Sequence, residues 1–378
     1  MQDRPTTAKL QKYQAYIDGK WCDADGGKTF QTFDPYTGEP WALIPECGAA
    51  EVDRAVNAAY RAFESPAWAN MTQTARGRLL RRIAQNIEKH AEHLAQIEVR
   101  DNGKLISEMA AQTKYLPEWF YYYGGLADKI TGTVVPVDKP DHFTYTLREP
   151  VGVCGFIIPW NSPLMLVGWK LAPALAAGCT VVIKPSEYTS ASLLEFIKLV
   201  IEPLDLPPGV INVVTGYGAA TGEPLVTHPK VAKIAFTGGS ATGARVGALA
   251  AQTFKKVSLE LGGKSPNIVF DDCILDDAVS GAVSGIFAAT GQTCIAGSRL
   301  LLHKLDDQHD PRDADAALMA IRTNAAKGAV ATGLLYVNQT QQDMHDILAT
   351  DARPLNEVPM AELCPGSKAL EAINARLR

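Results

Sequence analysis

Five short segments hold the residues whose types and spacing are best suited to chemistry, and the first contains Cys294. This cysteine ends the run Gly291-Gln292-Thr293-Cys294. A thiol just after a glycine turn can be exposed, and nearby backbone N–H groups can stabilise its thiolate, which is the nucleophilic form. A single cysteine is more often a small buried apolar residue. Cys294 therefore predicts a nucleophile only in combination with other groups.

Two further segments offer a base and a hydrogen-bond donor. Glu260 ends an apolar run and is followed by two glycines, which allow close approach, so its carboxylate is a candidate general base. Asn161 ends the turn Pro159-Trp160-Asn161, where a side-chain amide can donate to an oxyanion. The alternatives are a strand-end carboxylate in solvent and an ordinary turn asparagine.

The last two kinds of segment are suited to a dinucleotide. Lys184 and Glu187 lie three residues apart across a turn, and both can reach ribose hydroxyls; the alternative is a surface ion pair. Two glycine-containing loops also follow apolar runs, but such loops are frequent in α/β proteins. Their glycines are Gly216, Gly218 and Gly222 in one loop and Gly238, Gly239 and Gly243 in the other.

A sheet must position these segments, because most of them follow a short apolar run. From residue 151 such runs alternate with helical stretches, which predicts a parallel sheet covered on both faces. Ligands of open α/β sheets bind at the carboxyl edge of the strands, which is where the candidates lie. The expected strands are 153–158, 180–183, 210–214, 233–236, 257–261 and 267–270, and the expected helices are 164–177, 189–201, 219–227, 241–254 and 275–290.

The remaining segments differ in sequence pattern from this α/β part. Residues 1–48 are rich in turns and predict an arm with small strands. Apolar residues at helical spacing predict helices over 51–70, 75–100 and 107–130, the second of which stops at Asn102-Gly103. Residues 131–149 predict a hairpin that leaves the main body. After Lys304 we expect an acidic linker over 305–315, a helix over 314–327 and a strand over 333–337.

Composition excludes several classes of function. The 378 residues are 47% hydrophobic and 20% charged with a net charge of -5, which favours a folded protein and disfavours nucleic acid as a partner. Seven cysteines without a Cys-x-x-Cys pair disfavour a zinc site or a disulfide framework, so we expect no metal and a reducing, cytoplasmic location. The most apolar stretch, 163–179, contains Lys170 and two prolines, and the first residues lack a signal peptide, so no membrane is expected.

Taken together, the five segments resemble the aldehyde dehydrogenase superfamily over residues 16–304. Their order matches that family, and so does the separation of 34 residues between Glu260 and Cys294. The matching motifs are Pro159-Trp160-Asn161, Lys184-Pro185-Ser186-Glu187, Phe236-Thr237-Gly238, Leu259-Glu260-Leu261-Gly262-Gly263-Lys264-Ser265-Pro266 and Gly291-Gln292-Thr293-Cys294. The implied fold is α/β, with a Rossmann-type parallel NAD-binding sheet, an incomplete catalytic domain and a hairpin.

The resemblance implies NAD-dependent oxidation of an aldehyde to a carboxylic acid. Cys294 is similar to the nucleophile that forms a thiohemiacetal and then a thioester. Asn161 and the backbone N–H of Cys294 would hold the oxyanion, and Glu260 would activate the water that hydrolyses the thioester.

The cofactor that the resemblance implies is NAD. Lys184 and Glu187 would bind the adenosine ribose, and Glu187 would repel the 2′-phosphate of NADP. Gly238 and the helix after it would lie near the pyrophosphate, with Gly239 where many members have serine. The implied cofactor residues are Ile157, Pro159, Trp160, Lys184, Ser186, Glu187, Gly218, Gly222, Phe236, Thr237, Gly238, Gly239 and Leu261.

The C-terminal segment departs from the family. Only 84 residues follow Cys294, and they hold no Phe-Gly-Pro motif. The tail from about 307 resembles the C-terminus of the β subunit of 2-oxoacid:ferredoxin oxidoreductases, in Thr332-Gly333-Leu334-Leu335-Tyr336-Val337, Arg353-Pro354-Leu355-Asn356 and Ala361-Glu362-Leu363-Cys364-Pro365-Gly366. We therefore expect a truncated enzyme with an NAD-binding domain over 1–130 and 150–260, an oligomerisation hairpin over 131–149, a partial catalytic domain over 261–304 and an unrelated tail over 305–378.

Three functions remain open on these grounds. The first is an NAD-dependent aldehyde dehydrogenase, assembled as a homo-oligomer as the family implies. The second is a catalytically impaired NAD-binding remnant or fusion product, in which the missing segment weakens turnover and oligomerisation. The third is a thiol acyltransferase or esterase that uses Cys294 without turnover of a cofactor.

Overall fold

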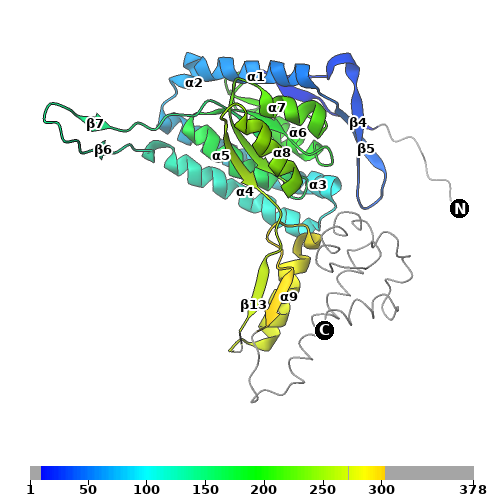
Figure 1. Ribbon diagram of the computed structural model, residues 1–378. Helices are drawn as coiled ribbons and strands as arrows, with labels where there is room; N and C mark the ends of the chain where they lie inside the picture. Colours follow the sequence, from blue (N-terminus) through cyan, green and yellow to red (C-terminus); the bar gives the residue numbers. More distant parts are fainter. Residues whose placement is uncertain (1–9, 271, 303–378) are drawn as a thin grey trace, which may run out of the picture. The chain divides into compact units, whose positions relative to one another are not determined.

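The computed structural model describes residues 10–270 and 272–302, which are divided into two units between Leu261 and Gly262 (Figure 1). The linker, helix and strand expected after Lys304 lie outside the described residues, as does the tail. The predicted α/β fold with its parallel sheet is confirmed in the first unit, whose main sheet has seven strands.

The main sheet has the strand order β12-β11-β8-β9-β10-β2-β3. The five strands at the β12 side are parallel, while the N-terminal arm adds β2 and β3 as antiparallel neighbours of β10. The bounds are β2 Ala15–Ile17, β3 Lys20–Cys22, β8 Val153–Ile157, β9 Thr180–Lys184, β10 Ile211–Val213, β11 Val231–Thr237 and β12 Lys256–Glu260. A smaller sheet of the arm has the order β1-β5-β4, with β1 Gln11–Lys12, β4 Thr29–Phe33 and β5 Pro40–Pro45.

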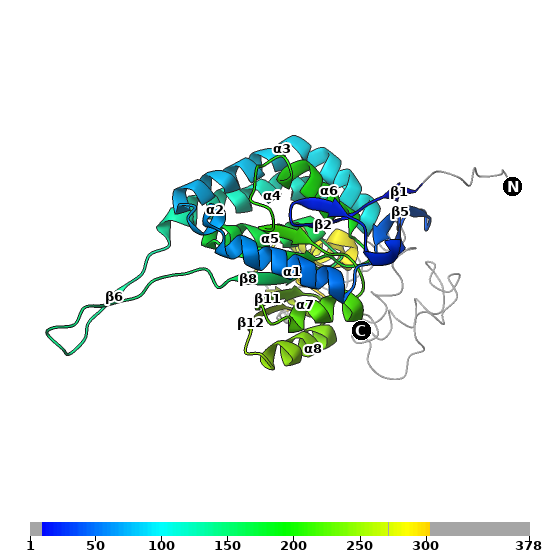
Figure 2. The ribbon, with the colours of Figure 1, turned by 90° about the horizontal axis from the view of Figure 1, so that it is seen from above.

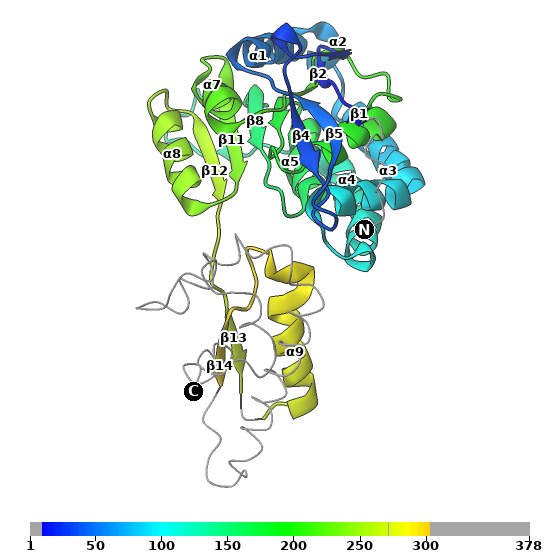
Figure 3. The ribbon, with the colours of Figure 1, turned by 90° about the vertical axis from the view of Figure 1, so that its right-hand side faces the viewer.

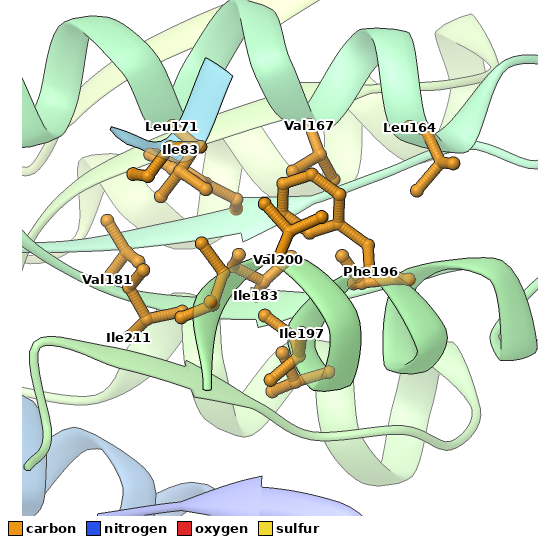
Figure 4. Packing of buried hydrophobic residues seen from close by; sticks show 14 of the residues in the cluster. Ile83, Leu164, Val167, Leu171, Val181, Ile183, Phe196, Ile197, Val200 and Ile211 are labelled. Atoms are coloured by element: carbon orange, nitrogen blue, oxygen red, sulfur yellow. The ribbon is translucent and has the colours of Figure 1, made fainter. Parts of the chain in front are cut away.

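Helices cover both faces of the main sheet (Figure 2). Alternation along β9 shows why both faces are apolar: Val181 and Ile183 lie in one buried cluster and Val182 lies in the other. The first cluster is packed beneath α3 Gln73–Asn102, α4 Ile106–Leu126, α5 Pro163–Ala177 and α6 Ala191–Phe196, and Figure 4 shows part of it. The second is covered by α1 Ala49–Glu64, α7 Glu223–Thr227 and α8 Ser240–Ala251. Short pieces complete the helical segments, namely α2 Pro66–Ala69, two π-helical turns Ile197–Ile201 and Gly218–Gly222, and 3₁₀ turns Asp25–Gly27 and Ala127–Lys129.

Helix α3 is the longest described helix, and its ends follow the sequence signals. Thr72 caps its first turn, since its Oγ1 accepts from the N–H of Ala75 at 3.2 Å. Gly103 ends it in the left-handed conformation at φ 72°, which confirms the predicted stop. The helix end therefore turns sharply, and its last residues lie beside the turn that contains Asn161.

The hairpin predicted over 131–149 contains β6 Val134–Val135 paired with β7 Thr144–Tyr145. It extends away from the rest of the first unit (Figures 1 and 2). Its apolar side chains are exposed, with Val134 66%, Phe143 74% and Leu147 70% accessible. Such a contiguous apolar segment is typical of a surface that contacts another chain.

In the part of the second unit that the structure describes, a two-stranded parallel sheet lies beside one helix (Figure 3). Its elements are β13 Pro266–Val269, α9 Leu275–Phe287, a 3₁₀ turn Ala288–Gly291 and β14 Arg299–Leu302. The expectation that the strand at 267–270 joins the main sheet is wrong. It pairs instead with β14, because two glycines end β12 and the chain leaves the main sheet at its edge strand.

Candidate functional site

The parallel register brings the ends of four strands to one edge of the main sheet. Ile157 lies opposite both Lys184 and Phe236, and Thr237 lies opposite Glu260. Two backbone hydrogen bonds continue the pairing past the strand ends: Ile158 N–H donates to the Lys184 carbonyl at 2.9 Å, and Gly238 N–H donates to the Glu260 carbonyl at 3.0 Å. The segments predicted from separate motifs are therefore neighbours at the carboxyl edge.

Asn161 lies in the turn between β8 and α5 and is half-buried, as are Pro159 and Trp160. Pro163 begins α5 directly after this turn, where a proline costs no helical hydrogen bond. The turn thus places the asparagine at the same sheet edge as Ile157, and at the N-terminal end of a buried apolar helix.

Lys184 and Glu187 form an ion pair, with 3.7 Å between Nζ and Oε2. The alternative of a surface pair is wrong for the lysine, whose side chain is 3% exposed, while that of Glu187 is 30% exposed. Burial lowers the pKa of Lys184 from its ordinary value, and the charge of Glu187 opposes that shift. Lys184 Nζ also donates to the Pro185 carbonyl at 2.9 Å, so the ammonium is fixed at the end of β9.

Ser186 lies inside the same turn and is buried. Its hydroxyl accepts from Tyr188 N–H at 3.3 Å, and its carbonyl accepts from the Ser190 hydroxyl at 2.8 Å. These bonds fix the turn between Lys184 and Glu187.

The two glycine loops differ in what surrounds them. Gly218 and Gly239 are exposed, and a Cβ at either position would meet nothing within 4 Å. Gly239 precedes the first turn of α8, and no side chain caps that helix. By contrast, a Cβ on Gly222 would touch the Lys184 side chain at 3.7 Å, and one on Gly238 would lie 2.6 Å from the Phe236 ring. Gly218 and Gly239 therefore leave space for a ligand, whereas Gly222 and Gly238 allow close packing inside the site.

Glu260 is exposed at the end of the edge strand β12, and Leu261 after it is half-buried. A Cβ on Gly243 would lie 2.4 Å from Leu261 Cδ2, so the glycine of α8 makes room for this leucine. The leucine therefore packs against the first turns of α8 next to the candidate pyrophosphate position.

Cys294 belongs to the second unit and is exposed. It follows a turn in which Ala289, Thr290 and Gly291 all have positive φ, at 54°, 57° and 71°. Two consecutive non-glycine residues in this region are strained, which is a recurrent feature of functional turns. A Cβ on Gly263 would lie 3.2 Å from the Cys294 carbonyl oxygen, so one of the two glycines after Glu260 allows the backbone of the thiol residue to approach.

Lys170 is a candidate that sequence reasoning missed. It lies in α5, and its Nζ donates to Thr237 Oγ1 at 2.6 Å, at the sheet edge next to Glu260. Burial lowers the pKa of Lys170 to about 8, and the negative charge of Glu260 opposes this shift. A lysine inside the most apolar helix was a signal for such a role, since buried ammonium groups need a partner.

Within residues 10–270 and 272–302, no group of three or more His, Cys, Asp or Glu side chains is arranged to hold a metal ion. No helix in that same part of the chain is both long and apolar enough to cross a membrane.

Comparison with known proteins identifies a family that this chain matches. The model of the aldehyde dehydrogenase family matches residues 21–339, beyond Lys304, where we expected the resemblance to end. The expected likeness of the tail to an oxidoreductase β subunit is not shown by these comparisons.

Several relatives are similar over most of the chain. The (Z)-2-((N-methylformamido)methylene)-5-hydroxybutyrolactone dehydrogenase of Acinetobacter baylyi is 50% identical over 295 residues, which are 78% of this chain and 60% of that protein. A crystal structure of betaine aldehyde dehydrogenase from Staphylococcus aureus in complex with NAD+ has a TM-score of 0.79 at 38% identity, covering 84% of this chain and 61% of that one. An aldehyde dehydrogenase from Bacillus cereus has a TM-score of 0.78 at 42% identity, with 83% and 63% covered.

The chain thus spans about 60% of the length of the relatives it matches. Its mixed α/β fold with a parallel, Rossmann-type sheet is the fold of those structures. On the extent of the family match and the identity to these proteins, the chain belongs to the aldehyde dehydrogenase family.

Proposed function

We propose that this chain takes part in the NAD-dependent oxidation of an aldehyde to a carboxylic acid. The observation that carries this proposal is the gathering of Lys184, Glu260 and the Asn161 turn at one carboxyl edge of a parallel sheet. That edge is where α/β folds bind dinucleotides.

The residues at this edge fit NAD. The exposed backbone at Gly218 and Gly239 has open space above it, and the uncapped N-terminus of α8 suits a pyrophosphate. Lys184 and Glu187 would bind the adenosine ribose, with Ile157, Pro159, Trp160, Ser186, Gly222, Phe236, Thr237, Gly238 and Leu261 completing the surface. When bound, NAD supplies a hydride acceptor. Glu187 selects against NADP because its carboxylate repels a 2′-phosphate.

Cys294, Asn161 and Glu260 each have a separate role in the reaction. The Cys294 thiolate forms a C–S bond with the aldehyde carbon, and the carbonyl electrons move to oxygen. Asn161 and the Cys294 N–H donate to that oxygen; one such donor contributes about 10²–10³-fold in rate in other enzymes. A thioester remains once the hydride has passed to the acceptor that NAD would supply. A water then attacks the thioester and gives its proton to Glu260, and the C–S bond breaks to release the carboxylic acid and the Cys294 thiolate.

The test is NADH formation from a panel of aldehydes, with Cys294→Ala as the control. We expect NADH from the wild type and none from the variant. Glu260→Gln should keep the NADH burst and slow the steady state, because only deacylation needs the base. Loss of the burst in Glu260→Gln contradicts that role.

The other two functions give different results in the same assay. A catalytically impaired remnant binds NAD but forms no NADH. A thiol acyltransferase or esterase hydrolyses an activated ester without NAD and loses that activity in Cys294→Ala.

Two further proposals concern the assembly and the location of the protein. We propose that the apolar hairpin at 131–149 contacts another copy of the chain in a homo-oligomer. We propose a reducing, cytoplasmic location on the six free cysteines of the described residues.

A further inference from the structure

The turn that contains Asn161 is held by polar side chains from the end of α3 and the residues just after it. Asn102 Nδ2 donates to the backbone carbonyl of Asn161 at 3.5 Å. Lys104 Nζ donates to the hydroxyl of Ser162 at 3.0 Å. The backbone of the asparagine and the side chain of its neighbour are therefore both fixed from one direction.

A third contact lies further along the chain, at the start of α5. Leu164 N–H, in the first turn of α5, donates to Glu98 Oε1 at 3.4 Å. Glu98 and Asn102 lie one helical turn apart on α3, so they share a face. The three side chains together reach positions 161, 162 and 164, which are the amide-bearing residue and the start of the segment that follows it.

These holding groups are buried to an unusual degree. Glu98 is 1%, Asn102 0% and Lys104 2% exposed. Burial raises the pKa of Glu98 to about 7, and the charge of Lys104 opposes this shift. Apolar side chains of similar volume would give stability without the cost of burying a carboxyl and an ammonium group. The presence of polar groups here thus indicates that they fix the geometry of the turn rather than add to the stability of the fold.

The backbone at the end of α3 is also part of this network. Gly103 adopts φ 72°, and the N–H of Lys104 donates to Asn102 Oδ1 at 3.0 Å, so the chain turns back on the helix end. A non-glycine residue at Gly103 would be strained in this conformation.

We propose that Glu98, Asn102 and Lys104 are positioning residues that set the direction of the Asn161 side-chain amide. They act by fixing the Asn161 carbonyl, the Ser162 hydroxyl and the Leu164 N–H, and none of them is assigned contact with substrate. The inference rests on the proposed function, in which that amide donates to the oxyanion. A misplacement of about 1 Å in such a group lowers rate by about 10²-fold.

The test compares Lys104→Met with a matched control, Arg76→Met. Arg76 lies at the other end of α3, is also buried, and donates through Nη2 to the Trp68 carbonyl at 3.1 Å. We expect Lys104→Met to lower kcat by about 10–100-fold with an unchanged KM for NAD. Arg76→Met should lower thermal stability and leave kcat per folded molecule unchanged. Equal effects of the two variants on kcat overturn the proposal.

A double-mutant cycle separates positioning from general structural damage. If Lys104 acts through Asn161, adding Lys104→Met to Asn161→Ala causes no further loss of kcat, because the group that it positions is gone. An additive loss overturns the proposal. If Asn161→Ala itself has full activity, the oxyanion role in the proposed function fails.

Hydrogen exchange decides the inference even in a protein without turnover. We expect the backbone amides within 161–165, which exclude Pro163, to exchange about tenfold faster in Lys104→Met and in Glu98→Gln, and to keep their wild-type rate in Arg76→Met. Absence of NADH from the wild type is then a failure of the proposed function alone. Unchanged exchange at 161–165 in both network variants is a failure of this inference.

Discussion

Glu98 gives the described residues a pH-dependent stability of unusual sign. Burial raises its pKa to about 7 from the ordinary 4.5, so the folded protein binds this proton more tightly than the unfolded chain does. The contribution of Glu98 therefore favours folding below about pH 4.5 and is lost as the pH rises toward 7. The physical reason is that an ionised carboxylate is costly to bury, so the folded protein loses stability as Glu98 gives up its proton.

Glu98→Gln removes this dependence, because glutamine does not titrate. We expect the free energy of unfolding of the variant, relative to wild type, to increase by roughly 1 kcal/mol per pH unit between pH 5 and 7. Urea denaturation at several pH values measures this difference. The neighbouring Asp101, whose pKa burial also raises to about 7, is present in both proteins, and its negative charge contributes to the raised pKa of Glu98. A difference that is constant with pH contradicts the prediction.

Glu187 is expected to decide between the two nicotinamide dinucleotides. Glu187→Ser removes the carboxylate that accepts from the 2′-hydroxyl and repels a 2′-phosphate, so the ratio of NADP to NAD affinity should rise by at least about tenfold. Calorimetric titration with each dinucleotide measures the ratio. Glu202→Gln, which changes another glutamate that is partnered by Trp21 Nε1 at 3.2 Å, is the matched control. Tighter binding of NADP than NAD by the wild type contradicts the role of Glu187.

The sequence predicted those candidate residues that a local motif places. It did not predict those whose position depends on a partner far along the chain. Lys184 and Glu187 are three residues apart, so the turn alone indicates that they are neighbours. Lys170 is 67 residues from Thr237, and only the packing of α5 on the sheet brings them together. The roles of the three catalytic candidates Cys294, Glu260 and Asn161 stay predictions.

At the level of elements, the contact of α3 with α4 depends on glycine. A Cβ on Gly77 would lie 2.5 Å from the Gly124 carbonyl oxygen, which is backbone and cannot rotate away. Gly77→Ala should therefore lower the free energy of unfolding by about 1–3 kcal/mol. Gly125→Ala is the control, since a Cβ there meets nothing within 4 Å and alanine favours the helix by about 0.5–1 kcal/mol. Chemical denaturation of both variants checks the opposite signs.

Element types followed from local pattern, whereas sheet membership did not. The apolar spacing of α3 and the alternation of β9 are set by neighbours within a few residues, and both elements were predicted. The partner of β13 is β14, which begins at Arg299, and the pairing of Tyr16 with Val213 joins positions 197 apart. Such pairings are decided by the whole fold, because the short runs themselves are compatible with several neighbours.

On the scale of the whole molecule, the residues assigned to the dinucleotide all precede Gly262. They belong to the first unit, which has its own buried clusters on both faces of its sheet. A fragment of residues 1–261 should therefore fold and bind NAD with an affinity within about tenfold of the full chain. Calorimetry and circular dichroism check this. A fragment that folds but does not bind NAD shows that residues after Leu261 contribute to the dinucleotide site.

The order of the two units along the chain also sets the order of their synthesis. Leu261 ends the first unit, and Cys294 follows 33 residues later. At a translation rate of about 5–20 residues per second, roughly 2–7 seconds separate these two residues on the ribosome. Domains fold as units during synthesis, N-terminal first. A nascent chain can therefore complete the groups proposed to bind dinucleotide before the thiol proposed as the nucleophile has been made.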